Sequence, residues 1–138
     1  FPKCIFYIVG GDKLNEELPE NVIPIGNMPH DELPKFISNK QFYLQLSMSE
    51  GFPNALCEAM LCGSIPIVSN VGAMSEIVGD DGFILQEKND LYLEKLIKLA
   101  LQANKETLAI AARKRIVENF TLSRRQNDLN STISSHIK

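Results

Sequence analysis

Short apolar runs rich in β-branched and aromatic residues recur along the chain, with polar, helix-like segments between them. The first run, at residues 4–9, is followed at once by two glycines, a pattern typical of a strand buried on both faces of a parallel sheet. Further strands are predicted at residues 22–25, 42–46, 65–68 and 82–85. These runs together predict a sheet of short, mostly buried strands.

Helical patterns separate the strands, at residues 31–38, 53–61 and 74–78. Alternating strands and helices favour an α/β fold, a Rossmann-like doubly wound parallel sheet with right-handed crossovers. A sheet of this kind binds ligands beyond the carboxyl ends of its strands. Candidate sites are therefore expected in the loops that follow the strands.

The pattern changes after Gln86, where apolar residues begin to recur at helical spacing. Two amphipathic helices are predicted, the first on Leu91, Leu96, Leu99 and Ala100 and the second on Leu108, Ala111, Ala112 and Ile116. Asn104 is expected to separate them, and Phe120 to end the second. Thr121 is a suitable N-cap for a last, polar helix running toward Lys138.

Residues 47–63, SMSEGFPNALCEAMLCG, join a predicted strand to an almost wholly apolar helix and hold the strongest candidate site. Pro53 suits the first helical position, because its φ is already helical and its missing N–H would have had no partner there. The helix is therefore expected to begin near Phe52 or Pro53, with Phe52 as the N-cap.

The N-cap expected at this helix start offers no side-chain oxygen to the amides of Asn54, Ala55 and Leu56. Water could satisfy these amides, or Glu50 could fold back onto them. A phosphate or a sugar hydroxyl is the alternative that implies function, since free amides at the positive end of a helix dipole bind anions.

Glu58 is the only charged residue of this helix, and no residue three or four positions away can form an ion pair with it. A helix that is apolar all round is normally buried, and a buried carboxylate requires hydrogen-bond donors. The donor could be a Lys, Arg or hydroxyl of another element. It could also be a ligand hydroxyl, such as a ribose diol.

The spacing of Glu50 and Glu58 resembles the E-x7-E signature of retaining GT-B glycosyltransferases, the glycosyl transferases group 1 family. The downstream segments GSIPIVS, VG and EIV, at residues 63–69, 71–72 and 76–78, resemble that family's CG-PVV-S, VGG and EIV motifs. Ala73 stands where the family has its second glycine. The resemblance spans most of the chain.

The resemblance implies a role for each matched residue. Glu58 would hold the ribose hydroxyls of a nucleotide-diphosphate sugar, and Glu50, the catalytic residue, would contact the donor sugar or stabilise charge near its anomeric carbon. The base would lie against Asn27 and Met28. Sugar hydroxyls and the distal phosphate would meet the segment Gly51, Phe52, Pro53, Asn54, Ala55 and Leu56, in which the proline has no N–H to donate.

The resemblance also implies that no metal and no cofactor is needed, because an Arg, a Lys and helix-end amides neutralise the leaving diphosphate in this family. Those two basic residues lie upstream of residues 4–9 in the family, and nothing here matches them. Residues 1–138 are therefore expected to form a C-terminal nucleotide-sugar-binding domain that lacks its first strand and its N-terminal acceptor domain. In the strand order 3-2-1-4-5-6, the missing strand belongs between residues 4–9 and 42–46.

Composition fits one domain with a core, since 44% of the 138 residues are hydrophobic. A net charge of −3 gives no general attraction to nucleic acid. Three cysteines without metal-ligand spacing read as reduced core residues. We expect a cytoplasmic protein, with peripheral association at the inner membrane face as an open alternative.

The function predicted from the sequence is retaining transfer of a sugar from a nucleotide-diphosphate sugar to a sugar or glycolipid acceptor bound by the missing domain. Two alternatives belong to other classes. A sugar-nucleotide 2-epimerase would require a catalytic His and an acidic set that cannot be placed here. A non-catalytic nucleotide-binding domain would keep the helix-end site and tolerate loss of Glu50.

Overall fold

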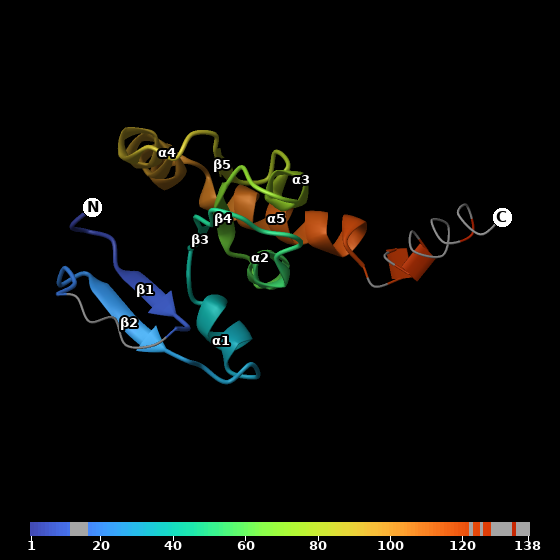
Figure 1. Ribbon diagram of the computed structural model, residues 1–138, viewed down its shortest axis with the longest axis horizontal. Coiled ribbons are helices and arrows are strands. Elements are labelled where there is room, and N and C mark those ends of the chain that lie inside the picture. The colour runs from blue at the N-terminus through green and yellow to red at the C-terminus, as the bar shows by residue number, and fades with distance from the viewer. Residues whose placement is uncertain (12–16, 122, 125, 128–133, 135–138) are drawn as a thin grey trace. The chain divides into compact units, whose positions relative to one another are not determined.

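The computed structural model describes residues 1–11, 17–121, 123–124, 126–127 and 134 (Figure 1). The chain divides into two compact units, Phe1–Phe36 and Ile37–Lys138. Both units have the α/β character predicted from the sequence, with parallel strands and helices.

The first unit contains a two-stranded parallel sheet formed by β1 (Phe6–Val9) and β2 (Val22–Gly26). α1 (Leu33–Ile37) follows β2 and begins within this unit. The ring of Tyr7 meets the ring of Phe36 edge-on, with centroids 5.5 Å apart. This aromatic contact ties β1 to the helix.

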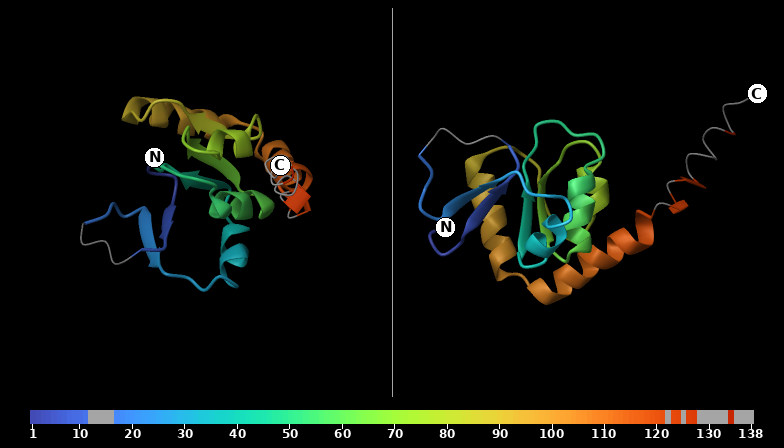
Figure 2. Two further views of the ribbon diagram at one scale, coloured as in Figure 1. Left: turned by 45° about the vertical axis from the view of Figure 1, so that its right-hand side comes forward. Right: turned by 90° about the horizontal axis from the view of Figure 1, so that it is seen from below.

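The second unit contains a three-stranded parallel sheet in the order β3-β4-β5. Its strands are β3 (Phe42–Gln45), β4 (Ile65–Ser69) and β5 (Phe83–Leu85). Its helices are α2 (Asn54–Leu61), α3 (Met74–Val78), α4 (Asp90–Gln102) and α5 (Lys105–Asn119). α4 lies on one side of the sheet, and α2 and α3 lie on the other (Figure 2).

Every residue of the central strand β4 is buried. Because side chains alternate across a strand, Val68 joins a core cluster with α2, α3 and α5, while Ile67 joins a second cluster with Ile97 and Ala100 of α4. The near-continuous apolar run of β4 is thus explained by the helices that pack on both faces of the sheet. Asn89 and Asn104 cap α4 and α5 with their side chains.

The predicted strands and helices are confirmed to within two residues at each end in the described part of the chain, and all pairings are parallel. The prediction that residues 4–9 form a strand buried on both faces was wrong, because Tyr7, Ile8 and Val9 are exposed. The sheet is not continuous, however, because β1 and β3 belong to different sheets. Whether a further strand belongs between them stays a prediction. The proposed polar helix lies largely outside the described residues, although Thr121 accepts the N–H of Arg124 as an N-cap would.

The predicted apolar face of α5 is confirmed, but the prediction for α4 was partly wrong about which apolar residues are buried. Leu91 and Leu99 are exposed, whereas Ile97 and Ala100 are the buried residues of α4. Only a narrow stripe of residues along α4 packs against the sheet. Apolar residues outside that stripe therefore remain exposed to solvent.

Arg115 of α5 fixes the end of α3. Its Nε donates to the carbonyl of Ile77 and its Nη2 to the carbonyl of Glu76, both at 2.7 Å. The last carbonyls of a helix have no partner within the helix, so the guanidinium supplies one and favours the negative end of the dipole. A Cβ on Gly79 would overlap this guanidinium.

We expect Arg115→Met to lower the free energy of unfolding of the full-length protein by about 1.5 kcal/mol, the low end for hydrogen bonds to a charged group, because the guanidinium is part-exposed. Arg115→Lys should restore only part of this stability, since an ammonium group lacks the planar, forked donors of a guanidinium. Urea unfolding measures both. Lys114→Met, which removes an exposed ion pair of 3.8 Å, is the matched control, and an equal loss there would contradict the assignment.

Candidate functional site

The segment between β3 and α2 lies at the carboxyl end of the parallel sheet, where the prediction placed a site. The loop between β4 and α3 is hydrogen-bonded to this segment, since the N–H of Ala73 donates to the carbonyl of Gly51 at 3.2 Å. Gly72 has a φ of +53°, and a Cβ there would overlap the carbonyl oxygen of Glu50 and lie 2.9 Å from that of Gly51. The backbone behind Glu50 therefore depends on a glycine at this position.

The start of α2 differs by one residue from the prediction. Pro53 is the N-cap, in an extended conformation, and the helix begins at Asn54. The expectation that Phe52 is the cap was wrong, because Pro53 takes the flanking position instead of the first helical one. No side chain caps the helix, as predicted.

The free amides at this helix start are fewer than predicted. The N–H of Leu56 donates to the carbonyl of Pro53 at 3.2 Å. Among the described residues no acceptor is recorded for the N–H groups of Asn54 and Ala55, and both residues are exposed. These two amides remain available at the positive end of α2.

Glu50 does not fold back onto the helix. Its Oε1 accepts hydrogen bonds from Nε2 of Gln45 at 3.0 Å and from Oγ of Ser47 at 2.8 Å. The hydroxyl of Tyr43 in turn donates to Oε1 of Gln45 at 3.2 Å. Glu50 is therefore held by residues of β3 and the turn, which leaves the helix amides to another partner.

Glu58 lies on α2, half-buried. The prediction of an entirely buried helix was wrong, because Ala55 and Leu61 are exposed while Leu56, Ala59 and Met60 pack inward. Within the described residues no hydrogen bond or ion pair is recorded for the Glu58 carboxylate. The alternative of a Lys, Arg or hydroxyl partner from another element thus finds no support there.

Tyr43 is influenced by both glutamates. Burial raises the pKa of its phenol above the ordinary value, and the charges of Glu50 and then Glu58 raise that pKa further. A charge acts on a titrating group in this way only from nearby. The charges of the two predicted carboxylates therefore both act on the phenol of Tyr43, a residue of β3.

Asn27 and Met28, the residues predicted to contact the base, follow β2 in the first unit. Asn27 is exposed and Met28 is half-buried. They lie after the carboxyl end of a parallel strand, as the prediction assumed. Their contact with a base stays a prediction.

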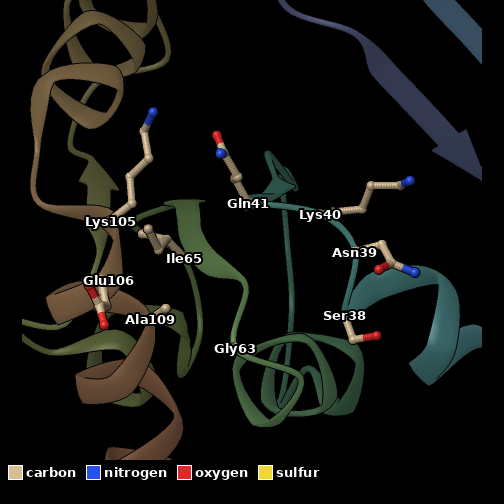
Figure 3. A pocket seen from close by; sticks show the side chains of 9 residues that line it. All are labelled: Ser38, Asn39, Lys40, Gln41, Gly63, Ile65, Lys105, Glu106 and Ala109. Carbon is tan, nitrogen blue, oxygen red and sulfur yellow. The ribbon is translucent and has the colours of Figure 1, made fainter.

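A cavity of about 300 Å³ lies elsewhere on the second unit, and Figure 3 shows the residues that line it. Gln41 and Gly63, which precede β3 and β4, contribute to it together with Lys105 and Glu106 at the start of α5. The cavity is thus at the amino end of the strands, opposite the Glu50 turn, and we assign it no part in the site.

Cys57 and Cys62 are half-buried, so the description of the cysteines as core residues was too strong. Within the described residues no group of three or more metal-binding side chains is found, and the expectation that no metal is needed stays a prediction. No helix in that same part of the chain is long and apolar enough to cross a membrane.

Comparison with known proteins identifies relatives for this chain. The family described as glycosyl transferases group 1 matches residues 2–120. Over 105 residues the chain is 28% identical to a subunit of the phosphatidylinositol N-acetylglucosaminyltransferase of Arabidopsis thaliana, covering 69% of this chain and 24% of that protein. Over 136 residues it is 26% identical to the UDP-Gal:alpha-D-GlcNAc-diphosphoundecaprenol alpha-1,3-galactosyltransferase of Escherichia coli, covering 90% of this chain and 35% of that protein.

A solved structure gives the same fold. The crystal structure of HepE from Anabaena, in complex with UDP, matches 97% of this chain and 42% of its own, with a TM-score of 0.77 and 21% identity. The chain therefore spans less than half the length of each of these three proteins.

The parallel strands and the helices between them define an α/β domain, a class that binds ligands beyond the carboxyl ends of its strands. The match over residues 2–120 is more specific. The chain belongs to the glycosyl transferases group 1 family, of the GT-B fold, as the resemblance implied.

Sequence reasoning missed the residues that hold Glu50. Tyr43, Gln45 and Ser47 are spaced by two, so they share one side of the extended chain. A polar residue on every second position of a strand that is otherwise apolar was the signal available. Gly72 was noticed only as part of a motif, and its close approach to Glu50 could be seen only in the structure.

We expect Gly72→Ala to lower the turnover of the full-length enzyme more than about 10-fold, because the overlap with the Glu50 carbonyl must displace the turn, and a 1 Å misplacement of reacting groups can cost 10²-fold. Gly79→Ala is the matched control, since Gly79 has the same φ of +53° and its Cβ would meet Arg115 instead. Both variants should lose stability. Steady-state kinetics showing equal losses of turnover in the two would contradict this role for Gly72.

Proposed function

We propose that the full-length protein is a retaining glycosyltransferase that transfers a sugar from a nucleotide-diphosphate sugar to an acceptor. The observation that carries the proposal is the uncapped start of α2, where the amides of Asn54 and Ala55 have no recorded acceptor within the described residues. Glu50 lies in the turn before this helix start, and Glu58 lies on the helix. Free helix-start amides can bind a phosphate, and carboxylates can accept hydrogen bonds from hydroxyls.

Glu58 is proposed to accept hydrogen bonds from the ribose hydroxyls of the donor. Its carboxylate has no recorded partner within the described residues, and a half-buried carboxylate gains by accepting such bonds. The amides of Asn54 and Ala55 would meet the distal phosphate at the positive end of α2. Asn27 and Met28 would contact the base.

Glu50 is proposed to act on the transferred sugar. A carboxylate held in one place stabilises positive charge that develops at the anomeric carbon, and this stabilisation needs no reorganisation during the reaction. Retention of configuration is inferred from the resemblance of the Glu50 and Glu58 spacing to the E-x7-E signature. Metal-independent transfer follows from the same resemblance.

Uridine diphosphate is the first nucleotide to test. The name of the Escherichia coli relative contains UDP-Gal, and HepE was crystallised in complex with UDP. Lipids stand in the names of the Arabidopsis thaliana relative and of the Escherichia coli galactosyltransferase. We therefore propose a glycolipid acceptor, which a domain outside this chain would bind, together with a role in polysaccharide or glycolipid synthesis at the cytoplasmic face of a membrane.

We expect Glu58→Gln in the full-length enzyme to weaken nucleotide binding by about 1.5–3 kcal/mol, the range for hydrogen bonds to a charged group. Titration calorimetry with uridine, guanosine and adenosine diphosphates measures the affinity. Glu118→Gln is the control, because Glu118 is an exposed residue of α5 in a surface ion pair. A folded Glu58→Gln protein with wild-type affinity would remove Glu58 from the site, and no binding by the wild type would oppose the proposed function.

We expect Glu50→Gln to lower kcat and to leave the affinity for nucleoside diphosphate almost unchanged, because Glu50 is proposed to contact the sugar and not the nucleoside. Kinetics and calorimetry on the same preparation separate the two effects. The anomeric configuration of the wild-type product, read by NMR, tests retention directly. Equal losses of nucleotide affinity in Glu50→Gln and Glu58→Gln would refute the division of roles.

A further inference from the structure

The two oxygens of the Glu50 carboxylate have different surroundings. Oε1 accepts both protein hydrogen bonds, from Gln45 Nε2 at 3.0 Å and from Ser47 Oγ at 2.8 Å. For Oε2 no hydrogen bond is recorded within the described residues. A carboxylate can accept about four hydrogen bonds, so the arrangement occupies one oxygen and leaves the other open.

The orientation of the Gln45 amide decides whether it attracts or repels Glu50. A glutamine side chain presents an acceptor at one end and two donors at the other. The hydroxyl of Tyr43 donates to Oε1 of Gln45 at 3.2 Å, and this contact points the amide nitrogen toward Glu50. A reversed amide would place its oxygen against the carboxylate.

Tyr43 is suited to orienting the Gln45 amide because its phenol remains a hydrogen-bond donor. Burial raises the pKa of Tyr43, and the charges of Glu50 and Glu58 raise it further. The ring packs on the core cluster that includes Leu56 and Met60, so the hydroxyl is carried on a fixed side chain. A protonated, immobile hydroxyl can accept nothing from Gln45 Oε1 and can only donate to it.

The backbone of Glu50 is fixed independently of its side chain. Gly72 lies against the Glu50 carbonyl, and Ala73 donates to the next carbonyl, that of Gly51. The β4–α3 loop therefore restrains the backbone of Glu50, and residues of β3 and the turn restrain its carboxylate. Such restraint is what a preorganised catalytic group requires.

Building on the proposed function, we propose that Gln45 is a positioning residue for Glu50 and that Tyr43 acts through Gln45. Gln45 and Ser47 occupy Oε1 of Glu50 with hydrogen bonds. Oε2 of Glu50 is left to contact the transferred sugar. The reaction gains from a carboxylate that cannot rotate away when positive charge develops at the anomeric carbon.

The first test compares three variants of the full-length enzyme. Gln45→Met keeps the length of the side chain and removes the donor, and it should lower kcat by about 10- to 100-fold, the equivalent of one hydrogen bond to a charged group. Gln45→Glu replaces the donor with a second carboxylate and should lower kcat further. Gln41→Met, just before the opposite end of the same strand, is the matched control and should behave as wild type.

The second test asks whether Tyr43 acts through Gln45. Tyr43→Phe keeps the ring and removes the hydroxyl, and it should lower kcat less than Gln45→Met does. In the Gln45→Met background the same change should have no further effect, because the amide that it orients is gone. Ser47→Thr, which keeps a hydroxyl, should retain more activity than Ser47→Ala.

Nucleotide affinity must stay within about 2-fold of wild type in these variants, since a positioning role lowers kcat alone. A kcat for Gln45→Met near that of wild type, or an equal loss of nucleotide affinity, would overturn the role of Gln45. Additive effects of Tyr43→Phe and Gln45→Met would overturn the role of Tyr43.

A readout without turnover separates this inference from the proposed function. The side-chain amide signals of Gln45 in a ¹⁵N-correlated NMR spectrum, assigned by their loss in Gln45→Met, should shift in both Tyr43→Phe and Glu50→Gln. Signals that do not move in either variant would overturn the hydrogen-bonded network. A wild-type protein that transfers no sugar but shows these shifts would overturn the proposed function and leave the network established.

Discussion

The second unit depends on the burial of β4 on both faces. Val68 packs into the cluster formed with α2, α3 and α5, and Ile67 packs into the cluster formed with α4. Burial of apolar surface contributes about 25 cal/mol per Å², and the side chains of this strand contribute to the packing of α2, α3, α4 and α5. The turn that holds Glu50 and the loop that holds Gly72 both begin at the carboxyl ends of strands fixed in this way.

The fold was predictable because strand and helix periods differ and because most residues of the strands are apolar. The run at residues 65–68 predicted a buried strand, and the structure has one at Ile65–Ser69. The break between the two sheets was harder to predict from the sequence. The apolar pattern of a strand indicates whether its faces are buried, but not which strand is hydrogen-bonded to each of its edges. The exposed side chains of Leu91 and Leu99 show the same limit for helices, where periodicity defines an apolar face wider than the stripe that packs.

The candidate site was predictable where a charge stood alone. Glu58 was noticeable because nothing near it in sequence could pair with it, and the described residues provide no partner either. The surroundings of Glu50 were not predictable, since the contacts of Gln45 and Tyr43 arise from side chains that meet only when β3 is extended and the turn closes. The start of α2 was misjudged by one residue because proline is compatible with both the cap and the first helical position.

Arg115 connects α5 to the region of Glu50 through two sets of hydrogen bonds. It holds the last carbonyls of α3, and the residue before α3, Ala73, holds the carbonyl of Gly51. A helix of five residues cannot persist alone, so α3 would lose its form if α5 detached, and the turn would lose its support with it. In terms of local unfolding, an opening that detaches α5 is therefore expected to release α3 and the Glu50 turn as well.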